Sequence, residues 1–225
     1  MPNERYGLGR LESPDARDQN FLMAAPPSTR TARFWWGYRL HLDQGNTPQC
    51  VAYSWSHFLV DSPDPHPAVL VDPAVLYHEA QTLDEWPGED YEGTSVRAGA
   101  KALVARSLIY TGYTWAFDLN TIIQNVLEVG PVVFGTNWYY SMFTPGSDNY
   151  IRINDAVTGP DGDPVAGGHA YKVDGVNVPK RFFRMKQSWA LPWGHHGFAR
   201  ISFDDAQRLI EAEQGEACMA VESVH

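Results

Sequence analysis

The chain has 225 residues, 44% of them hydrophobic and 20% charged, which excludes a disordered chain, a collagen and a coiled coil. Lysine and arginine number 17 against 27 acidic residues, and a net charge of −10 without a basic run argues against binding to nucleic acid or to an anionic membrane. With no apolar stretch of roughly 20 residues to span a bilayer, no secretory signal at its start and only two cysteines, we expect a cytoplasmic globular protein in a reducing compartment.

The sequence divides into an N-terminal segment, residues 1–35, and a domain that covers residues 36–225. The N-terminal segment is mixed and polar, and we expect it to lie extended over the surface. The domain opens with a helix that starts near Cys50, where apolar residues recur on one helical face. Thr47 and Pro48 provide the cap and the first-turn proline that this start requires.

Three further helices are predicted downstream. Asp72 caps the first of them and Ser95 caps the second. The third is indicated by an apolar stripe over residues 119–127, and Gly130 closes it. Helical periodicity therefore dominates the first half of the chain.

The second half of the chain favours β-strands. An irregular stretch over residues 144–168 interrupts it, and Asp174-Gly175 indicates a hairpin turn. The predicted strands are 132–134, 170–173, 181–185 and 197–202. Helices first and strands second predict an α+β protein with two lobes and a functional site in the cleft between them.

Cys50 is the candidate nucleophile. It lies in the first turn of its helix, where free N–H groups and the positive end of the helix dipole stabilise a thiolate. The alternative is that Cys50 is a small buried hydrophobic residue. Cys218 lies in an apolar, strand-like run where burial disfavours the thiolate, so Cys50 is expected to be the reactive thiol.

The residues around Cys50 resemble the active-site segment of papain-like cysteine peptidases. In that family Asp-Gln-Gly, a short variable stretch and Cys-Trp-Ala-Phe-Ser follow one another, and residues 43–54 match this order. Gln44 stands six positions before Cys50, as in the family. Further along, residues 167–175 resemble the histidine strand, and residues 185–201 resemble the family's Lys-Asn-Ser-Trp-Gly block.

The resemblance covers about residues 36–202 and implies a papain-like fold. A helical lobe at about residues 45–115 would carry the cysteine, and an antiparallel β-barrel-like lobe at about residues 116–225 would carry the histidine. Residues 92–95 look like the glycine segment that lines the family's substrate groove. The resemblance therefore places the site in the cleft between the lobes.

The resemblance also implies the role of each site residue. Cys50 would be the nucleophile and His169 its base and later its acid, with Gln187 orienting the histidine. Gln44 would join the Cys50 backbone N–H in an oxyanion hole. Trp189 would shield the hydrogen bond of the histidine from water.

The substrate implied by the resemblance is a peptide or protein, bound without a cofactor or metal. Gly93, Thr94 and Gly168 would bind the substrate, and Gly93 would let its backbone approach closely. Asp155, Asp161 and Asp163 could suggest calcium, but their spacing lacks the last acidic ligand of an EF-hand, which favours a solvated turn.

Four positions depart from the family pattern. Gln187 stands in place of the orienting asparagine and has one more methylene, Val51 replaces the tryptophan after the nucleophile, and Ala190 replaces a glycine. Thr47 stands where papain has a disulfide cysteine, in keeping with a reducing compartment. We therefore expect reduced but real activity.

The last expectation from the sequence concerns how activity is regulated. Only 49 residues precede Cys50, so no full pro-domain is expected. Residues 8–10 and 15–18 resemble instead the lead-in of compact bacterial or phage-encoded members. Because an unregulated protease would harm a cytoplasm, we expect narrow specificity, a masked cleft or lost activity.

The sequence thus predicts a cysteine peptidase or amidase that cleaves through a thioester acyl-enzyme. Two alternatives stay open. The first is a papain-like binding or structural protein with impaired catalysis, and the second is an acyl-transferase that passes the same intermediate to an amine.

Overall fold

The computed structural model describes residues 5–35, 40–61, 72–106, 110–154 and 162–222. The α-helices in this part of the chain are α1 (Cys50–Asp61), α2 (Pro73–Leu83), α3 (Val96–Arg106), α4 (Leu119–Glu128) and α5 (Phe203–Gln207). The strands are β1 (Ala32–Phe34), β2 (Tyr110–Ala116), β3 (Val132–Tyr139), β4 (Tyr150–Ile151), β5 (Val165–Asn177), β6 (Phe182–Lys186), β7 (Phe198–Ser202) and β8 (Glu216–Glu222). Short helical turns are η1 (Ala16–Asn20), η3 (Tyr140–Phe143) and η4 (Arg208–Ala212).

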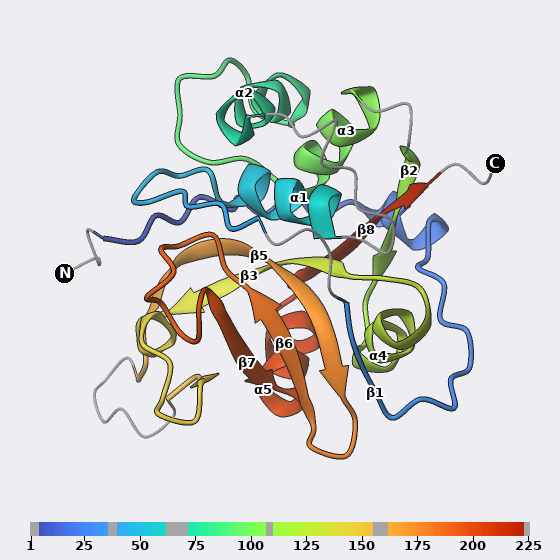
Figure 1. Ribbon diagram of the computed structural model, residues 1–225. Helices are drawn as coiled ribbons and strands as arrows, with labels where there is room; N and C mark the ends of the chain where they lie inside the picture. The colour runs from blue at the N-terminus through green and yellow to red at the C-terminus, as the bar shows by residue number, and fades with distance from the viewer. Residues whose placement is uncertain (1–4, 36–39, 62–71, 107–109, 155–161, 223–225) are drawn as a thin grey trace.

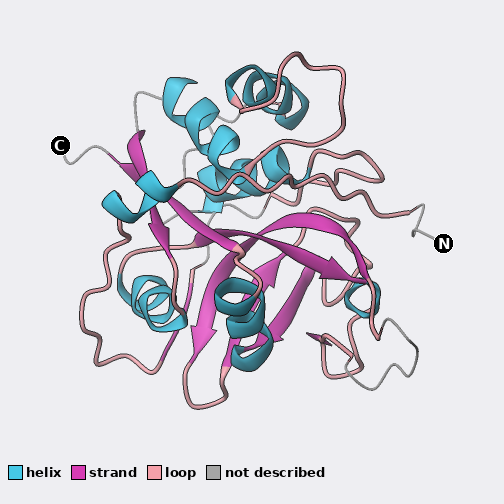
Figure 2. Ribbon diagram, turned by 180° about the vertical axis from the view of Figure 1, so that it is seen from behind, coloured by secondary structure: helices cyan, strands magenta, loops and turns pink. Residues whose placement is uncertain are grey.

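The architecture is a mixed α+β fold in which helices and one sheet face each other. The sheet has the order β2-β8-β3-β5-β6-β7-β4, with β1 added on β5. Its strand pairs are antiparallel except β4 with β7. Helices α1, α2 and α3 lie together on one side of β3 and β5 (Figure 1), while α5 lies against the opposite face of the sheet (Figure 2). The predicted two-lobed α+β class is confirmed.

Helix α1 occupies the centre of the molecule. Eleven of its twelve residues are buried, all except Tyr53, so it is enclosed on every side rather than on the single face that its periodicity predicts. The helix begins at Cys50, and the turn before it is closed by Thr47, whose hydroxyl donates to the Gln44 carbonyl at 2.7 Å. The burial of α1 fixes Cys50 against the sheet.

The start of each following helix obeys the capping signals in the sequence. The Asp72 carboxylate accepts from the Ala74 N–H at 2.9 Å, and the Ser95 hydroxyl accepts from the Ala98 N–H at 3.0 Å. The side chain of Asp118 caps α4 in the same manner. These helix predictions are confirmed.

Strand β5 differs from the prediction because it runs straight through the expected hairpin turn. Asp174-Gly175 lies inside the strand, where the pairing with β6 shifts register. Gly175 is required there because a Cβ would lie 2.2 Å from the Phe34 ring of β1. The chain turns later, where the Arg181 N–H donates to the Val178 carbonyl at 3.1 Å and Arg181 adopts a φ of 52°.

The irregular stretch predicted over residues 144–168 also contains ordered strands. It includes β4 and the first residues of β5. Asp163 accepts from the N–H groups of Ser141 and Asn154 at 3.3 and 2.9 Å. Asp155 and Asp161 lie outside the described residues.

The edge strand β2 is missing from the prediction. It pairs with β8, and this pairing places Trp115 opposite Cys218.

None of the described helices is both long and apolar enough to cross a membrane.

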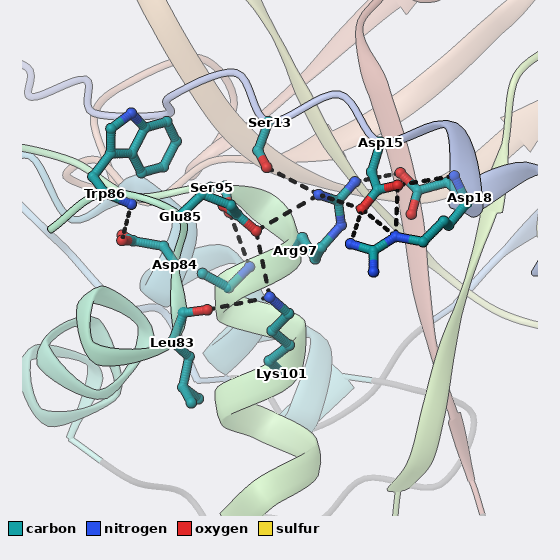
Figure 3. A network of polar contacts seen from close by, with 12 residues as sticks. Ser13, Asp15, Asp18, Leu83, Asp84, Glu85, Trp86, Ser95, Arg97 and Lys101 are labelled. Carbon is teal, nitrogen blue, oxygen red and sulfur yellow. Dashed lines mark hydrogen bonds and ion pairs between the residues drawn. The ribbon is translucent and has the colours of Figure 1, made fainter.

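The N-terminal segment is attached to α3 by a polar network around Arg97 (Figure 3). The Arg97 guanidinium donates to the Ser13 hydroxyl at 2.9 Å and forms an ion pair with Asp18. Lys101, one turn further along α3, donates to the Leu83 carbonyl at 3.2 Å and pairs with Glu85. Residues 13–18 are therefore anchored on the helical side of the molecule.

Candidate active site

Cys50 is fully buried at the N-terminus of α1, directly against β5. Its Sγ accepts a hydrogen bond from the Ala170 N–H at 3.4 Å. Ala170 is the residue after His169, so the backbone of the histidine strand contacts the sulfur. The fold thus brings Cys50 into contact with Ala170, 120 positions further along the sequence.

His169 lies on β5 and is held by Gln187, which follows β6. The distance from His169 Nε2 to Gln187 Oε1 is 2.7 Å. The Ser188 N–H donates to the same Oε1 at 3.1 Å, which identifies that atom as an acceptor. His169 Nε2 therefore carries the proton, and the buried Nδ1, which has no hydrogen-bond partner among the described residues, presents a lone pair.

Aromatic rings enclose the histidine. The Trp189 ring stacks on His169 with centroids 4.7 Å apart and an interplanar angle of 22°, and Trp138 meets His169 edge-on at 4.9 Å. Both tryptophans are fully buried. Apolar rings on two sides exclude water from the His169–Gln187 hydrogen bond and so strengthen it.

The side chain of Gln44 points an N–H into the cleft. Its Nε2 donates to the Thr47 carbonyl at 2.8 Å and to the Gly7 carbonyl at 3.2 Å. The indole N–H of Trp189 donates to the same Gly7 carbonyl at 3.1 Å. Two side-chain donors therefore converge on one carbonyl oxygen in the cleft, which is the arrangement that an oxyanion hole needs.

That carbonyl belongs to the N-terminal part of the chain itself, which runs between the helices and the sheet (Figure 1). The N–H groups of Gly9 and Arg10 donate to the Gly168 carbonyl at 3.1 and 3.0 Å. On the opposite wall the Thr94 N–H donates to the Gly9 carbonyl at 3.0 Å, and the Leu11 N–H donates back to Thr94 at 3.0 Å. We call residues 7–11 the cleft segment.

The cleft segment corrects the expectation that the N-terminal residues lie over the surface. Gly7 and Arg10 are buried, and the chain lies so close to the walls that glycine is needed on both sides. A Cβ on Gly93, whose φ is +98°, would lie 2.4 Å from the Gly9 carbonyl oxygen. A Cβ on Gly168 would lie 2.1 Å from the Arg10 carbonyl oxygen.

Each of the predicted site residues therefore lies along this cleft. Gln44 and Trp189 donate to the Gly7 carbonyl, His169 bonds to Gln187, and Cys50 contacts the residue after His169. The predicted substrate-binding residues contact the cleft segment and are Gly93, Thr94 and Gly168.

Burial sets the charge of the cysteine and histidine while the cleft segment is in place. Burial raises the pKa of the Cys50 thiol to about 12, against the opposing effect of the Ala170 N–H. Burial lowers the pKa of His169 to about 3, against the opposing effect of the Gln187 hydrogen bond. Both groups are therefore neutral at pH 7 in this masked state.

The other end of α1 carries a buried charge cluster. Asp61 accepts from Lys172 at 2.7 Å and also forms an ion pair with Lys186. Lys172 lies on β5, three residues after His169, and Lys186 directly precedes Gln187. The cluster therefore ties the cysteine helix to the strands that hold the histidine and the glutamine.

Sequence reasoning missed two residues of the cleft. Tyr6 stacks on Trp189 with centroids 4.7 Å apart, and Glu216 forms an ion pair with Arg10 at 2.8 Å. The available signal was the pair of glycines at positions 7 and 9. A Cβ on either would lie within 2.2 Å of a backbone oxygen before α1, so this segment can lie flat in the cleft only as glycine.

Within the described ranges, no set of three or more His, Cys, Asp or Glu side chains is arranged to hold a metal ion. A groove of about 580 Å³ extends the cleft beyond Tyr6, with walls that include Phe143, Trp193 and His195.

Comparison with known proteins defines the class of fold. No model of a protein family matches the chain, and a search of curated proteins gave no match. Among solved structures the chain is similar to xylellain, a cysteine protease from Xylella fastidiosa, with a TM-score of 0.72 and 16% identity over 100% of both chains.

Two other solved structures are similar. The digestive procathepsin L2 proteinase from the Tenebrio molitor larval midgut has a TM-score of 0.65 and 14% identity over 98% of this chain and 80% of that one. The bromelain protease from Ananas comosus, solved with the E64 inhibitor, has a TM-score of 0.58 and 14% identity over 87% of this chain and 100% of that one. The chain therefore has the papain-like cysteine protease fold, as its sequence predicts.

Proposed function

We propose that the protein is a cysteine peptidase that hydrolyses a peptide or amide bond through a thioester on Cys50. The observation that carries this proposal is the His169 ring. Gln187 holds its Nε2 at 2.7 Å, its Nδ1 is left without a partner among the described residues, and the next residue donates its N–H to the Cys50 sulfur. A cysteine next to the histidine strand, an imidazole with a free nitrogen and a third group that orients the imidazole are the components of nucleophilic catalysis.

The first half-reaction forms the acyl-enzyme. The Cys50 thiol gives its proton to His169 Nδ1, and the sulfur attacks the substrate carbonyl carbon. The tetrahedral oxyanion collapses, the C–N bond breaks, and the amine leaves with the proton from His169. The product that remains is a thioester on Cys50.

The second half-reaction consumes water. His169 removes a proton from a water molecule, the hydroxide attacks the thioester carbon, and the sulfur leaves as Cys50 is restored with its proton. Gln44 supports both steps, because its N–H already holds the Gly7 carbonyl where an oxyanion would form. Trp189 keeps other water away from the histidine.

Turnover requires the cleft segment to leave, because residues 7–11 occupy the space of a substrate backbone. Their departure also admits water to Cys50 and His169 and so relieves the burial that keeps both neutral. The expectation of a masked cleft therefore becomes part of the proposed function.

The test is a peptide library incubated with the full chain and with an Arg10→Ala variant, in which the cleft segment loses its ion pair with Glu216. Mass spectrometry of the products distinguishes hydrolysis from transfer to an added amine. We expect hydrolysis by at least one of these two proteins. We expect none by either protein once it also carries the Cys50→Ala substitution. Equal product with and without Cys50 would contradict the peptidase and leave a protein that only binds peptides.

A further inference from the structure

The mechanism leaves one buried histidine on the cysteine helix without a role. His57 lies on α1, seven residues after Cys50, which places it about two turns further along the same side of the helix. Its side chain is fully buried. Burial of an imidazole costs free energy that an apolar side chain of the same size would not, unless the ring makes a hydrogen bond. A specific contact is therefore expected to account for His57.

That contact is with the segment that leads to the oxyanion donor. The Leu42 N–H donates to His57 Nε2 at 3.0 Å. Leu42 stands two residues before Gln44, whose side chain donates to the Gly7 carbonyl in the cleft. Residues 40–44, which we call the donor segment, form neither helix nor strand, so their backbone N–H groups depend on partners elsewhere in the molecule. His57 supplies one of these partners.

The other side of the donor segment is bonded to the residues that follow β6. The Gln44 backbone N–H donates to the Ser188 carbonyl at 2.8 Å. His41 Nε2 lies 2.6 Å from the Trp189 carbonyl, and because a carbonyl only accepts, this nitrogen carries the proton. Both contacts lie directly after Gln187, the residue that orients the histidine of the site.

The donor segment therefore lies between two fixed parts of the candidate site. His57 attaches it to the helix that carries Cys50, and Ser188 attaches it to the stretch that holds the histidine. An oxyanion donor must keep a set distance from both, because the negative charge develops on the carbonyl that the sulfur attacks. A displacement of about 1 Å near the reacting atoms can cost about a hundredfold in rate. The bond to His57 thus acts on a distance to which the reaction is sensitive.

Only the neutral imidazole can make this bond. Because the Leu42 N–H is a donor, His57 Nε2 must present a lone pair, and the proton of the neutral ring is then on Nδ1. Burial lowers the pKa of His57 well below its ordinary value, and the positive charges of Lys186 and Lys172 lower it further. The buried charge cluster at the end of α1 therefore keeps the ring in the form that accepts.

We propose that His57 is a positioning residue for the proposed hydrolysis, and that its bond to the Leu42 N–H sets the place of the Gln44 side chain at the oxyanion. This inference rests on the proposed peptidase function, because it concerns the oxyanion donor of that same site. His57 acts on the reaction through the donor segment and not by contact with the substrate.

Two substitutions separate the acceptor from the space that the ring fills. His57→Gln places an amide oxygen as many bonds from Cβ as Nε2 is, and this oxygen accepts a hydrogen bond. His57→Leu fills much of the space but leaves the Leu42 N–H without its acceptor. We expect kcat to fall by about tenfold to a hundredfold in His57→Leu, with a smaller change in KM, and to recover most of this loss in His57→Gln.

The readout that a merely structural role would not move is a double-mutant cycle with Gln44→Ala. If His57 acts through Gln44, its substitution has no further effect once the Gln44 amide is gone. We therefore expect the His57→Leu, Gln44→Ala double variant to have about the kcat of Gln44→Ala alone. If His57→Leu does not fold, His57→Asn takes its place, because its shorter amide places the oxygen one bond short of the Nε2 position.

The matched control is Phe58→Leu, at the next position on α1. Phe58 is also buried, and its ring contacts Trp55 and Tyr110. Its truncation loosens the same helix through lost packing, and we expect a small change in kcat that is the same with and without Gln44. A full, additive loss in the His57→Leu, Gln44→Ala double variant, or a His57→Gln variant as slow as His57→Leu, would overturn the positioning role.

A measurement without turnover distinguishes the failure of this proposal from the failure of the proposed function. If neither the full chain nor Arg10→Ala cleaves any peptide, the proposed function fails, and nuclear magnetic resonance of glutamine-labelled protein then reports the Gln44 side-chain amide directly. Shifted Gln44 signals and faster hydrogen exchange of the Leu42 N–H in His57→Leu, both restored in His57→Gln, support the positioning of Gln44 by His57. Unchanged Gln44 signals in His57→Leu overturn it.

Discussion

The two ends of helix α1 use polar groups in opposite ways. At the N-terminal end, Cys50 and His169 are buried and neutral, and His169 Nδ1 has no partner among the described residues. At the C-terminal end, the buried Asp61 is paired with two lysines, Lys172 and Lys186. Strand β5 meets both ends of α1, through Ala170 at Cys50 and through Lys172 at Asp61. The end of β6 adds Lys186 at Asp61 and is followed by Gln187, which holds His169.

The difference distinguishes polar groups that hold the fold in place from polar groups that the proposed reaction would use. A buried charge that is fully paired fixes positions and has no capacity left for a ligand. A buried polar atom without a partner is costly, and a fold keeps it where a ligand or a reacting group supplies the partner. The charged end of α1 therefore fixes the frame around the neutral end, where the proposed reaction would take place.

The largest expected effect comes from the nucleophile. Cys50→Ala should lower turnover by about ten thousandfold or more, because the covalent route is lost. Turnover of a peptide found in the library is the measurement. Cys218→Ala is the matched control, since Cys218 is equally buried but lies on β8 next to the β2 edge, and it should keep its activity.

The charged end of α1 should matter for stability. Asp61→Asn takes from Lys186 the carboxylate it pairs with and leaves Lys172 only the more distant Asp174, at 3.8 Å. We expect the free energy of unfolding to fall by about 3–5 kcal/mol. Denaturant titration measures it. Asp204→Asn breaks the exposed pair with Arg181 and should cost less than about 1 kcal/mol. Equal losses in both variants would contradict a structural role for the buried charge cluster.

Gln44 should affect the chemical step more than binding. Gln44→Ala removes one oxyanion donor, and kcat should fall by about a hundredfold to a thousandfold with a smaller change in KM. The exposed Gln207 on α5 provides the control variant, Gln207→Ala, which should behave as wild type. An unchanged kcat in Gln44→Ala would contradict the proposal that Gln44 donates to the oxyanion.

Acid should destabilise the masked state through His169. Burial lowers the pKa of His169 from 6.5 to about 3, so between these values the unfolded chain binds a proton that the folded chain does not. The free energy of unfolding therefore falls as the pH falls from about 6.5 toward 3. Denaturant titrations along this range should give a shallower decline for His169→Gln, whereas the exposed His78→Gln should follow wild type. Equal slopes in all three proteins would contradict the buried neutral imidazole.

The smallest expected effect on turnover concerns Gln187, which stands in place of the family's orienting asparagine. Gln187→Ala should lower turnover by at least tenfold, because His169 loses the acceptor that fixes its proton on Nε2. Gln187→Asn keeps an amide and should be tolerated or mildly beneficial. If Gln187→Ala turns over as fast as wild type, another group orients the histidine.

Local signals predicted the elements well and long-range contacts poorly. The capping side chains of Asp72 and Ser95 give their helix starts directly, because a cap bonds within three residues. The turn expected at Asp174-Gly175 is wrong because the requirement for glycine comes from a different strand, where Phe34 approaches it. A pattern within one strand does not contain that contact.

The candidate site shows the same difference between local signals and long-range contacts. The residues around Cys50, His169 and Gln187 were predicted from motifs, and the structure brings them together. The pairing of Arg10 with Glu216 joins positions 206 residues apart and lies in segments without periodicity. It follows from the course of the cleft segment, which only the folded chain reveals.

The most direct test of the central claim is chemical labelling of the two cysteines. The full chain and its Arg10→Ala variant are treated at neutral pH with a limiting amount of a peptide-based thiol electrophile and then mapped by mass spectrometry. We predict that Cys50 is modified first, faster in Arg10→Ala than in wild type, and that His169→Ala slows the reaction. Modification of Cys218 ahead of Cys50, or a Cys50 rate that does not change in His169→Ala, would contradict the account.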